Sequence, residues 1–235
     1  MSLTVAAVFL ASGSAFAAEA EGEAAATPAA APAAAAPAAE PAAEGKESGL
    51  EVGARVGYGI PMGNAAEGSK MSDAFNGKIP LWLDVGYRLN RNIYVGGFFQ
   101  YGIGLMNDDK CKDCSGSVMR FGVNAQYHIM PTQKFDPWVG VGVGYEIATL
   151  SSKTTVLGQT FEASSSTKGL EFINLQAGGD YKVSPDFGIG PFLSFSLGQY
   201  SSSTVEINGQ ENSADIEKKA MHQWLILGVR GSFVL

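Results

Sequence analysis

Basic residues are scarce in this 235-residue chain, which has 16 Lys and Arg against 23 Asp and Glu. A nucleic-acid-binding protein would carry a basic patch or stripe, so this balance argues against that class. Much of the acidic excess lies near the N-terminus, where residues 18–48 hold six Glu and one Lys. The rest of the chain is close to neutral.

Long apolar runs are also missing. No stretch after residue 48 offers the roughly 18 consecutive apolar residues that a membrane-spanning helix needs. Glycine, in contrast, is abundant, because 27 of the 30 glycines follow residue 48. Since glycine disfavours helix interiors, this density argues against long helices and leaves a β-rich domain.

The first 48 residues fall into two segments. Residues 1–17 are predicted to be a secretory signal, with an apolar stretch leading to the small residues Ala15 and Ala17 at the positions that an export peptidase reads. Residues 18–48 contain 16 Ala and 4 Pro, the prolines interrupting every possible helix. We expect this segment to be a disordered, extended linker in the periplasm.

After Gly49, apolar residues recur at every second position, which is the period of a β-strand with two different faces. The alternation is cleanest where Val139, Val141 and Val143 are separated by glycines. Eight such segments occur, at about residues 51–60, 81–90, 95–103, 119–128, 139–147, 173–182, 189–198 and 225–233. The predicted domain therefore covers residues 49–235 and contains eight strands.

The connections between these strands alternate in length. Short turns lie at 90–92, 130–136 and 184–186, and long polar connections lie at 61–78, 106–116, 150–168 and 201–217. Short turns at one end and long loops at the other are typical of an outer-membrane barrel whose turns face the periplasm. The predicted fold is all-β, an eight-stranded antiparallel up-and-down transmembrane β-barrel.

Alternation alone does not say which face points outward, because a soluble lipocalin-type barrel alternates too. A water-facing row is normally rich in Lys, Glu and Thr, whereas the polar row here consists of glycine with isolated charges. We therefore predict that the apolar face meets lipid. Eight strands enclose an interior just wide enough for side chains, so we expect a largely plugged lumen.

Charged residues on the lumenal row must pair, because an unpaired buried charge is costly. They are Arg55, Asp84, Arg88, Arg120, Glu146, Asp180, Lys182 and Arg230. Arg120 and Glu146 are equidistant from the middle of the 130–136 turn, and Arg55 and Asp84 from the centre of the 61–78 connection. Both pairs are predicted to be lumenal ion pairs across neighbouring strands, either as a plug that fixes strand register or as part of a gated path for small solutes.

Aromatic residues recur near the ends of the predicted strands, where amphipathic rings suit the lipid headgroup region. These residues are Tyr58, Tyr87, Tyr101, Tyr127, Trp138, Tyr145, Tyr181, Phe187 and Phe233. We expect them to form an interfacial belt. Trp82 and Trp224 fall on the lumenal row instead.

The last strand, residues 224–235, ends in Gly-Ser-Phe-Val-Leu, with Phe233 and Leu235 on the lipid face. With this last strand and its eight alternating segments, the chain resembles the small eight-stranded outer-membrane barrels. This class contains the transmembrane domain of outer-membrane protein A and its opacity-protein, OmpX and OmpW-like relatives. The resemblance implies a barrel in the outer membrane of a Gram-negative-type bacterium, in contact with the bilayer and lipopolysaccharide. It also implies recognition of residues 224–235 by the barrel-assembly machinery, and it carries over no catalytic residue.

Few residues offer other chemistry. Cys111 and Cys114 lie in one long connection of an exported chain, which favours a small loop disulfide over a redox pair or a metal site. The two histidines, His128 and His222, fall at opposite ends of their strands, and neither is followed by the serine and carboxylate that a lipid-modifying enzyme needs. We expect no metal and no cofactor.

The sequence thus predicts a non-enzymatic outer-membrane barrel with a structural, surface-interaction or narrow-conduit role. A lipid-modifying enzyme and a soluble ligand-binding barrel are the alternatives. A ligand of the exposed loops is possible on this reading, but no residue identifies it.

Overall fold

The computed structural model of the protein describes residues 46–107, 114–156, 159–207 and 210–235. The predicted signal, residues 1–17, and all of the predicted linker up to residue 45 lie outside the described residues. The elements are β1 (Gly49–Ala66), β2 (Ser69–Lys70), α1 (Met71–Ala74), β3 (Phe75–Arg88), β4 (Ile93–Met106), β5 (Cys114–His128), β6 (Phe135–Val156), β7 (Gln159–Lys182), β8 (Phe187–Ile207), β9 (Gln210–Asp215) and β10 (Met221–Val234).

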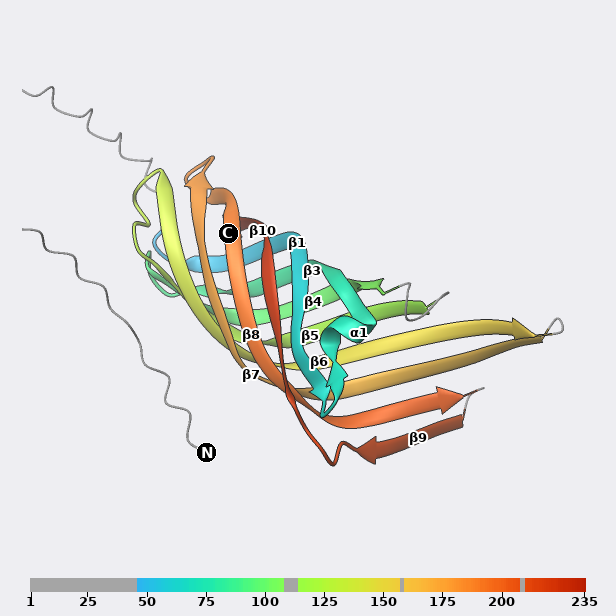
Figure 1. Ribbon diagram of the computed structural model, residues 1–235. Coiled ribbons are helices and arrows are strands. Elements are labelled where there is room, and N and C mark those ends of the chain that lie inside the picture. The colour runs from blue at the N-terminus through green and yellow to red at the C-terminus, as the bar shows by residue number, and fades with distance from the viewer. Residues whose placement is uncertain (1–45, 108–113, 157–158, 208–209) are drawn as a thin grey trace, which may run out of the picture. The chain divides into compact units, whose positions relative to one another are not determined.

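Eight of the strands form a closed antiparallel barrel, as Figure 1 shows. Each barrel strand pairs with the next along the chain, and β10 closes the ring by pairing with β1 on one side and β8 on the other. The short strands β2 and β9 are additions at one end. The structure confirms the predicted eight-stranded up-and-down barrel.

The two faces of the barrel wall differ as predicted. Leu83, Val141 and Leu227 are 46%, 48% and 51% exposed on the outside, whereas Arg120 and Arg230 are fully buried within. Because side chains alternate along a strand, each apolar outer residue is followed by a residue that points into the lumen. The lumen therefore holds the charges, and the outer wall is a continuous apolar surface.

In the part of the chain that the structure describes, no helix is long and apolar enough to cross a membrane.

The prediction of loops at residues 150–168 and 201–217 is wrong. Most of residues 150–168 and 201–217 belong to β6, β7, β8 and β9, which continue their pairing beyond the barrel as the long arms seen in Figure 1. The arms are rich in Ser and Thr. Because apolar residues such as Val205 and Ile207 are few in them, these segments do not show the sustained hydrophobic alternation that identified the other strands.

The 61–78 connection is not an open polar loop either. β1 continues to Ala66, the chain turns at Gly68 with φ +80°, and α1 follows. Met71 and Phe75 are each 2% exposed, and the Phe75 ring lies 6.0 Å from that of Trp224 in an edge-on contact. This segment therefore caps the lumen at the end that carries the arms, which we call the arm end; the opposite end is the short-turn end.

The core of the molecule lies inside the barrel. Its apolar residues come mostly from inward positions of the barrel strands and include Trp82, Phe98, Trp138, Phe192 and Trp224. Trp138 is 1% exposed, so its expected place in the interfacial belt is wrong. It lies on the inward row of β6, and its Nε1 donates a hydrogen bond to the buried Asp180.

Candidate functional site in the barrel lumen

The lumen contains a nearly balanced set of charges. Among the described residues, the buried Asp, Glu, Lys and Arg side chains are Glu51, Arg55, Lys78, Asp84, Arg88, Arg120, Asp136, Glu146, Glu171, Asp180 and Arg230. Four of these acids and bases, namely Glu51, Lys78, Asp136 and Glu171, were not among the predicted lumenal charges. Opposite charges in such numbers can neutralise one another within a narrow, water-poor interior.

Arg55 and Asp84 occupy the middle of the lumen and make a two-point contact. Arg55 Nε lies 2.6 Å from Asp84 Oδ2, and Nη2 lies 2.9 Å from Oδ1. Asn124 donates a further bond to Asp84, and Arg55 donates one to Gln176. In the β1–β3 register Asp84 is opposite Gly53, so the two side chains meet diagonally and not directly across the strands.

Arg120 lies nearer the arm end and contacts two carboxylates. It is directly opposite Glu146 in the β5–β6 register, with Nε 3.5 Å from Glu146 Oε2. The closer partner is Glu171, whose Oε2 is 2.6 Å from the same Nε. Glu171 reaches the lumen because a β-bulge lies between Glu171 and Ile173 in the β7–β8 pairing. The bulge shifts the alternation, so a strict period of two places this carboxylate on the wrong face.

Glu146 is the most heavily contacted carboxylate of this region. It accepts hydrogen bonds from the Tyr200 hydroxyl and from Trp224 Nε1, the latter at 3.1 Å. His222 Nε2 is also 3.1 Å from Glu146, and its ring stacks on Tyr200 with centroids 4.0 Å apart. The sequence did not identify Glu146 as the partner of His222, because Glu146 lies on β6 and His222 on β10.

A second network lies at the short-turn end. Glu51 bridges two arginines, with Arg88 Nε at 2.7 Å and Arg230 Nη2 at 2.8 Å. Arg230 Nη1 is 3.7 Å from Asp180, which also accepts a hydrogen bond from Trp138 Nε1. Glu51 thus adds a side-chain ion pair to the backbone pairing of the first strand with the last.

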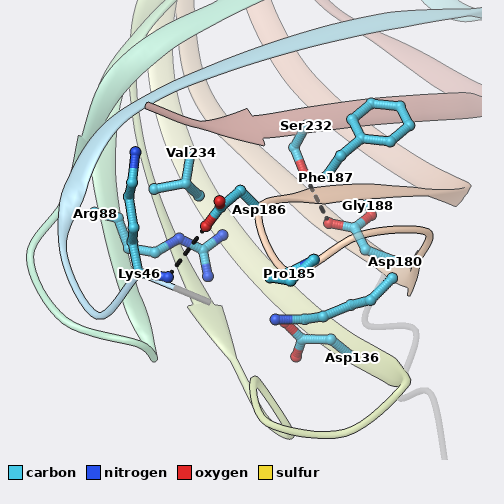
Figure 2. A pocket seen from close by; sticks show the side chains of 11 residues that line it. Lys46, Arg88, Asp136, Asp180, Pro185, Asp186, Phe187, Gly188, Ser232 and Val234 are labelled. Atoms are coloured by element: carbon cyan, nitrogen blue, oxygen red, sulfur yellow. Dashed lines mark hydrogen bonds between the residues drawn. The ribbon is translucent and has the colours of Figure 1, made fainter. Parts of the chain in front are cut away.

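A small cavity lies at the short-turn end, and Figure 2 shows the side chains that line it. The cavity has a volume of about 30 Å³, room for one water molecule, and lies among Arg88, Asp136, Asp180 and Ser232. His128 Nδ1 is 2.8 Å from Asp136. Lys182, the least buried of the predicted lumenal charges, turns to the rim and donates from Nζ to the Pro131 carbonyl at 2.5 Å.

Aromatic rings separate the charged levels of the lumen. The Arg55 guanidinium lies 4.5 Å from the Trp82 ring centroid and 5.4 Å from that of Trp138, so it sits between the two indoles. Arg230 stacks on Trp138 at 4.5 Å. A cation held over an indole face is stabilised by about 2 kcal/mol when it is desolvated. The rings therefore stabilise the buried cations and fill the space between them.

Lys78 differs from the buried arginines in its hydrogen bonding. Its Nζ makes no hydrogen bond, although the side chain is fully buried, and it lies 3.9 Å from the Trp224 ring centroid. The methylene chain packs where Gly59 and Gly102 leave room for it. Lys78 thus contributes a cation whose hydrogen-bonding capacity is unused.

Other candidate chemistry finds no open site. Both histidines pair with carboxylates but are at most 1% exposed, which keeps them from any substrate. Within the described ranges, no group of three or more His, Cys, Asp or Glu is placed to hold a metal. Cys111 lies outside the described residues, so the loop disulfide with Cys114 stays a prediction.

The geometry defines a class: a closed β-barrel with an apolar outer wall and a lumen filled by ion pairs and aromatic rings. The chain belongs to the outer membrane protein beta-barrel domain family, whose model matches residues 26–190. It is therefore an outer-membrane barrel protein. A comparison with curated proteins finds no match.

Three solved structures are similar to this chain. Neisserial surface protein A is 16% identical, with 79% of this chain and 98% of that one covered and a TM-score of 0.44. OprG from Pseudomonas aeruginosa is 13% identical, with 81% and 99% covered and a TM-score of 0.45. The outer membrane protease OmpT from Escherichia coli is 8% identical, with 80% and 97% covered and a TM-score of 0.42. The family assignment rests on the sequence match.

Proposed function

We propose that this protein is a closed barrel that holds a rigid β-sheet above the outer membrane for contact with a surface partner. The observation that carries the proposal is the continuation of the barrel strands beyond the lipid-facing wall. β6, β7 and β8 have 22, 24 and 21 residues, whereas about 9–11 residues suffice for a strand to cross a bilayer. The surplus length forms a paired sheet with β9.

The composition of this sheet, the arm sheet, suits an aqueous setting. One row across its four strands reads Thr149, Ser166, Thr204 and Ser213, each opposite the next in register. Thr149 and Ser166 are hydrogen-bonded at 2.9 Å, as are Thr204 and Ser213. Hydroxyl pairs across strands stabilise the pairing of this polar row. The arm sheet is thus a stiff, polar projection and not a flexible loop.

The filled lumen supports a role outside the barrel. Arg55, Arg120 and Arg230 each contact at least one carboxylate, and aromatic rings occupy the levels between them. An open channel for large solutes has no space in this arrangement. A narrow conduit is the second candidate, favoured by Lys78 Nζ and by both amide atoms of Gln126, which are buried without hydrogen bonds and could be satisfied by water in transit.

The proposal fixes the orientation of the chain. The short turns would face the periplasm, the arm sheet the exterior and the 18–48 linker the periplasm, after removal of the 1–17 signal. Residues 224–235 would be read by the barrel-assembly machinery, since this strand closes the barrel and ends with Phe233 pointing outward. The outer face of the arm-end rim would meet lipopolysaccharide.

The same features argue against the alternatives. The described part of the chain presents no accessible grouping of His, Ser and carboxylate for a lipid-modifying enzyme, so we propose a non-enzymatic role. A soluble ligand-binding barrel would expose its polar face to water, whereas here Leu83, Val141 and Leu227 form the outer wall.

Surface labelling of intact cells tests the proposal. We expect Ser213→Cys, in the arm sheet, to react with a membrane-impermeant maleimide on intact cells, and Ser184→Cys, in the turn between β7 and β8, to react only after the outer membrane is permeabilised. The wild-type chain is the control for its two native cysteines. The reverse pattern would overturn the orientation, and with it the surface role.

Conductance measurements separate the two candidate roles. In planar bilayers, the purified protein is expected to show no steps above the lipid background if it is a closed display platform. Reproducible single-channel steps that change in Lys78→Met would favour the narrow conduit instead.

A further inference from the structure

The arm sheet has an open edge. β9 pairs only with β8 among the described residues, and all six of its residues are exposed. The chain after β1, which flanks β10 in the barrel, contacts the 218–219 segment through Ala66 and Glu67 and then turns away at Gly68. The outer edge of β9 therefore presents unpaired backbone N–H and C=O groups, which can template another strand.

Devices that usually blunt such an edge are scarce in β9. The strand Gln-Glu-Asn-Ser-Ala-Asp contains no proline and no lysine, and its pairing with β8 runs without a bulge. Residues 211, 213 and 215 share one face because side chains alternate along a strand. That face carries two carboxylates, Glu211 and Asp215.

A like-charge contact lies beside this edge. Glu206 on β8 is directly opposite Glu211 on β9, and neither carboxylate forms an ion pair with another described residue. Like charges directly opposite one another on neighbouring strands are destabilising. A cation from outside the molecule, placed next to Glu211 in the functional state, would offset the repulsion between the two carboxylates.

From the open edge and the opposed carboxylates we infer that β9 accepts an extended basic peptide as an added strand of the arm sheet. Backbone hydrogen bonds to β9 would supply the affinity, and lysines or arginines at alternate positions would lie along Glu211 and Asp215. The partner is thus an extracellular protein with a basic, strand-forming segment. This inference rests on the proposed surface role, because it requires the arm sheet to face the exterior.

The test uses the full-length protein in lipid nanodiscs and fluorescent peptides of about eight residues, enough to span β9. An alternating Lys-Thr peptide is expected to bind and an alternating Glu-Thr peptide is not. Glu211→Lys should weaken Lys-Thr binding by about tenfold, because one attraction becomes a repulsion, and should favour the Glu-Thr peptide. Asp73→Lys, on the exposed face of α1, makes the same charge change away from the edge and should leave binding unchanged.

A second pair of probes separates strand addition from charge attraction. A Lys-Pro peptide has the same charge but lacks an N–H at every second residue and cannot pair as a regular strand, so it should not bind. Carbonyl isotope labels in the bound Lys-Thr peptide should show the infrared signature of an antiparallel sheet. Equal binding of the Lys-Pro and Lys-Thr peptides would overturn the inference, as would insensitivity to Glu211→Lys.

Two other occupants are also outcomes of the test. Displacement of the peptide by millimolar calcium, with Glu211-dependent stabilisation by the ion alone, would identify a cation site and overturn the inference. A dimer in light scattering that disappears in Glu211→Lys would identify a second copy of this chain and overturn it too. Labelling of Ser213→Cys on intact cells is independent of peptide binding, so failure of this inference is distinguishable from failure of the surface role.

Discussion

Arg55 and Asp84 join the first and second strands of the barrel from the inside, with a two-point contact at 2.6 and 2.9 Å. Both side chains are at most 1% exposed, so neither charge is solvated by water. The pair sits between the Trp82 and Trp138 rings, and Asn124 and Gln176 occupy further hydrogen-bonding positions around it. Such a pair is a constraint on register more than a large source of stability.

Removing one member of this ion pair should destabilise the protein more than replacing both members. We expect Asp84→Ala to lower the free energy of unfolding by about 3–5 kcal/mol, because it leaves the Arg55 charge buried and unpaired. The double variant Arg55→Met with Asp84→Leu should recover most of that loss. Urea unfolding of the protein refolded into lipid vesicles measures both, and equal losses in the single and double variants would contradict the expectation.

Glu171 distinguishes the structure from a strict alternation of faces. If Glu171 faced lipid, Glu171→Leu would stabilise the barrel; because it contacts Arg120 at 2.6 Å in the lumen, we expect a loss of about 3–5 kcal/mol. Phe172→Leu is the matched control, since Phe172 points outward and is 46% exposed. Unfolding in urea reads out both variants, and a stabilised Glu171→Leu protein would refute the bulge.

The apolar outer wall predicts that the cost of a charged substitution depends on its position along the strand. Val141→Arg places a charge on the lipid face and should cost about 2–4 kcal/mol, whereas Ser166→Arg, in the arm sheet, should cost no more than about 1 kcal/mol. The fraction of protein that inserts into vesicles and its unfolding midpoint are the measurements. Similar costs at the two sites would mean that the arm sheet is also within the bilayer.

The closing seam between β1 and β10 predicts a steric effect. Gly57 is opposite Gly228, and a Cβ on Gly228 would press on the Val56 carbonyl and lie 2.7 Å from Gly57 Cα. Gly228→Val should therefore cost about 1–3 kcal/mol and reduce the heat-modifiable, folded band on gels. Leu227→Val, one residue away on the outer face, should remain folded; if both variants fold normally, the close approach of the two backbones is not essential.

The strands and their facing were predictable because lipid on one side and a crowded lumen on the other impose a period of two. Val141 and Glu146 follow that period without interruption. Glu171 does not follow the period, because a bulge adds a residue to its strand. The sequence around the bulge, Gly-Leu-Glu-Phe-Ile, carries no turn signal that would predict it. The Arg55–Asp84 contact was placed on the right strands, but the register differs by two residues.

What the sequence did not reveal lies at the arm end. The strand character of residues 150–168 is not visible to hydrophobic patterning, since Ser, Thr and other polar residues predominate there. The burial of Met71 and Phe75 depends on the Trp224 ring, which comes from the last strand, more than 140 positions away. Contacts of such sequence separation leave no local signature.

The ion pair between Glu51 and Arg230 joins side chains 179 positions apart, at the two extremities of the folded chain. Neither the seam that contains it nor the ring as a whole can exist until the final strand has been translated and delivered. Every shorter intermediate has two unpaired strand edges and an exposed apolar wall, which promote aggregation in water. We therefore expect the chain to aggregate in water unless its last strand is present to pair with the first.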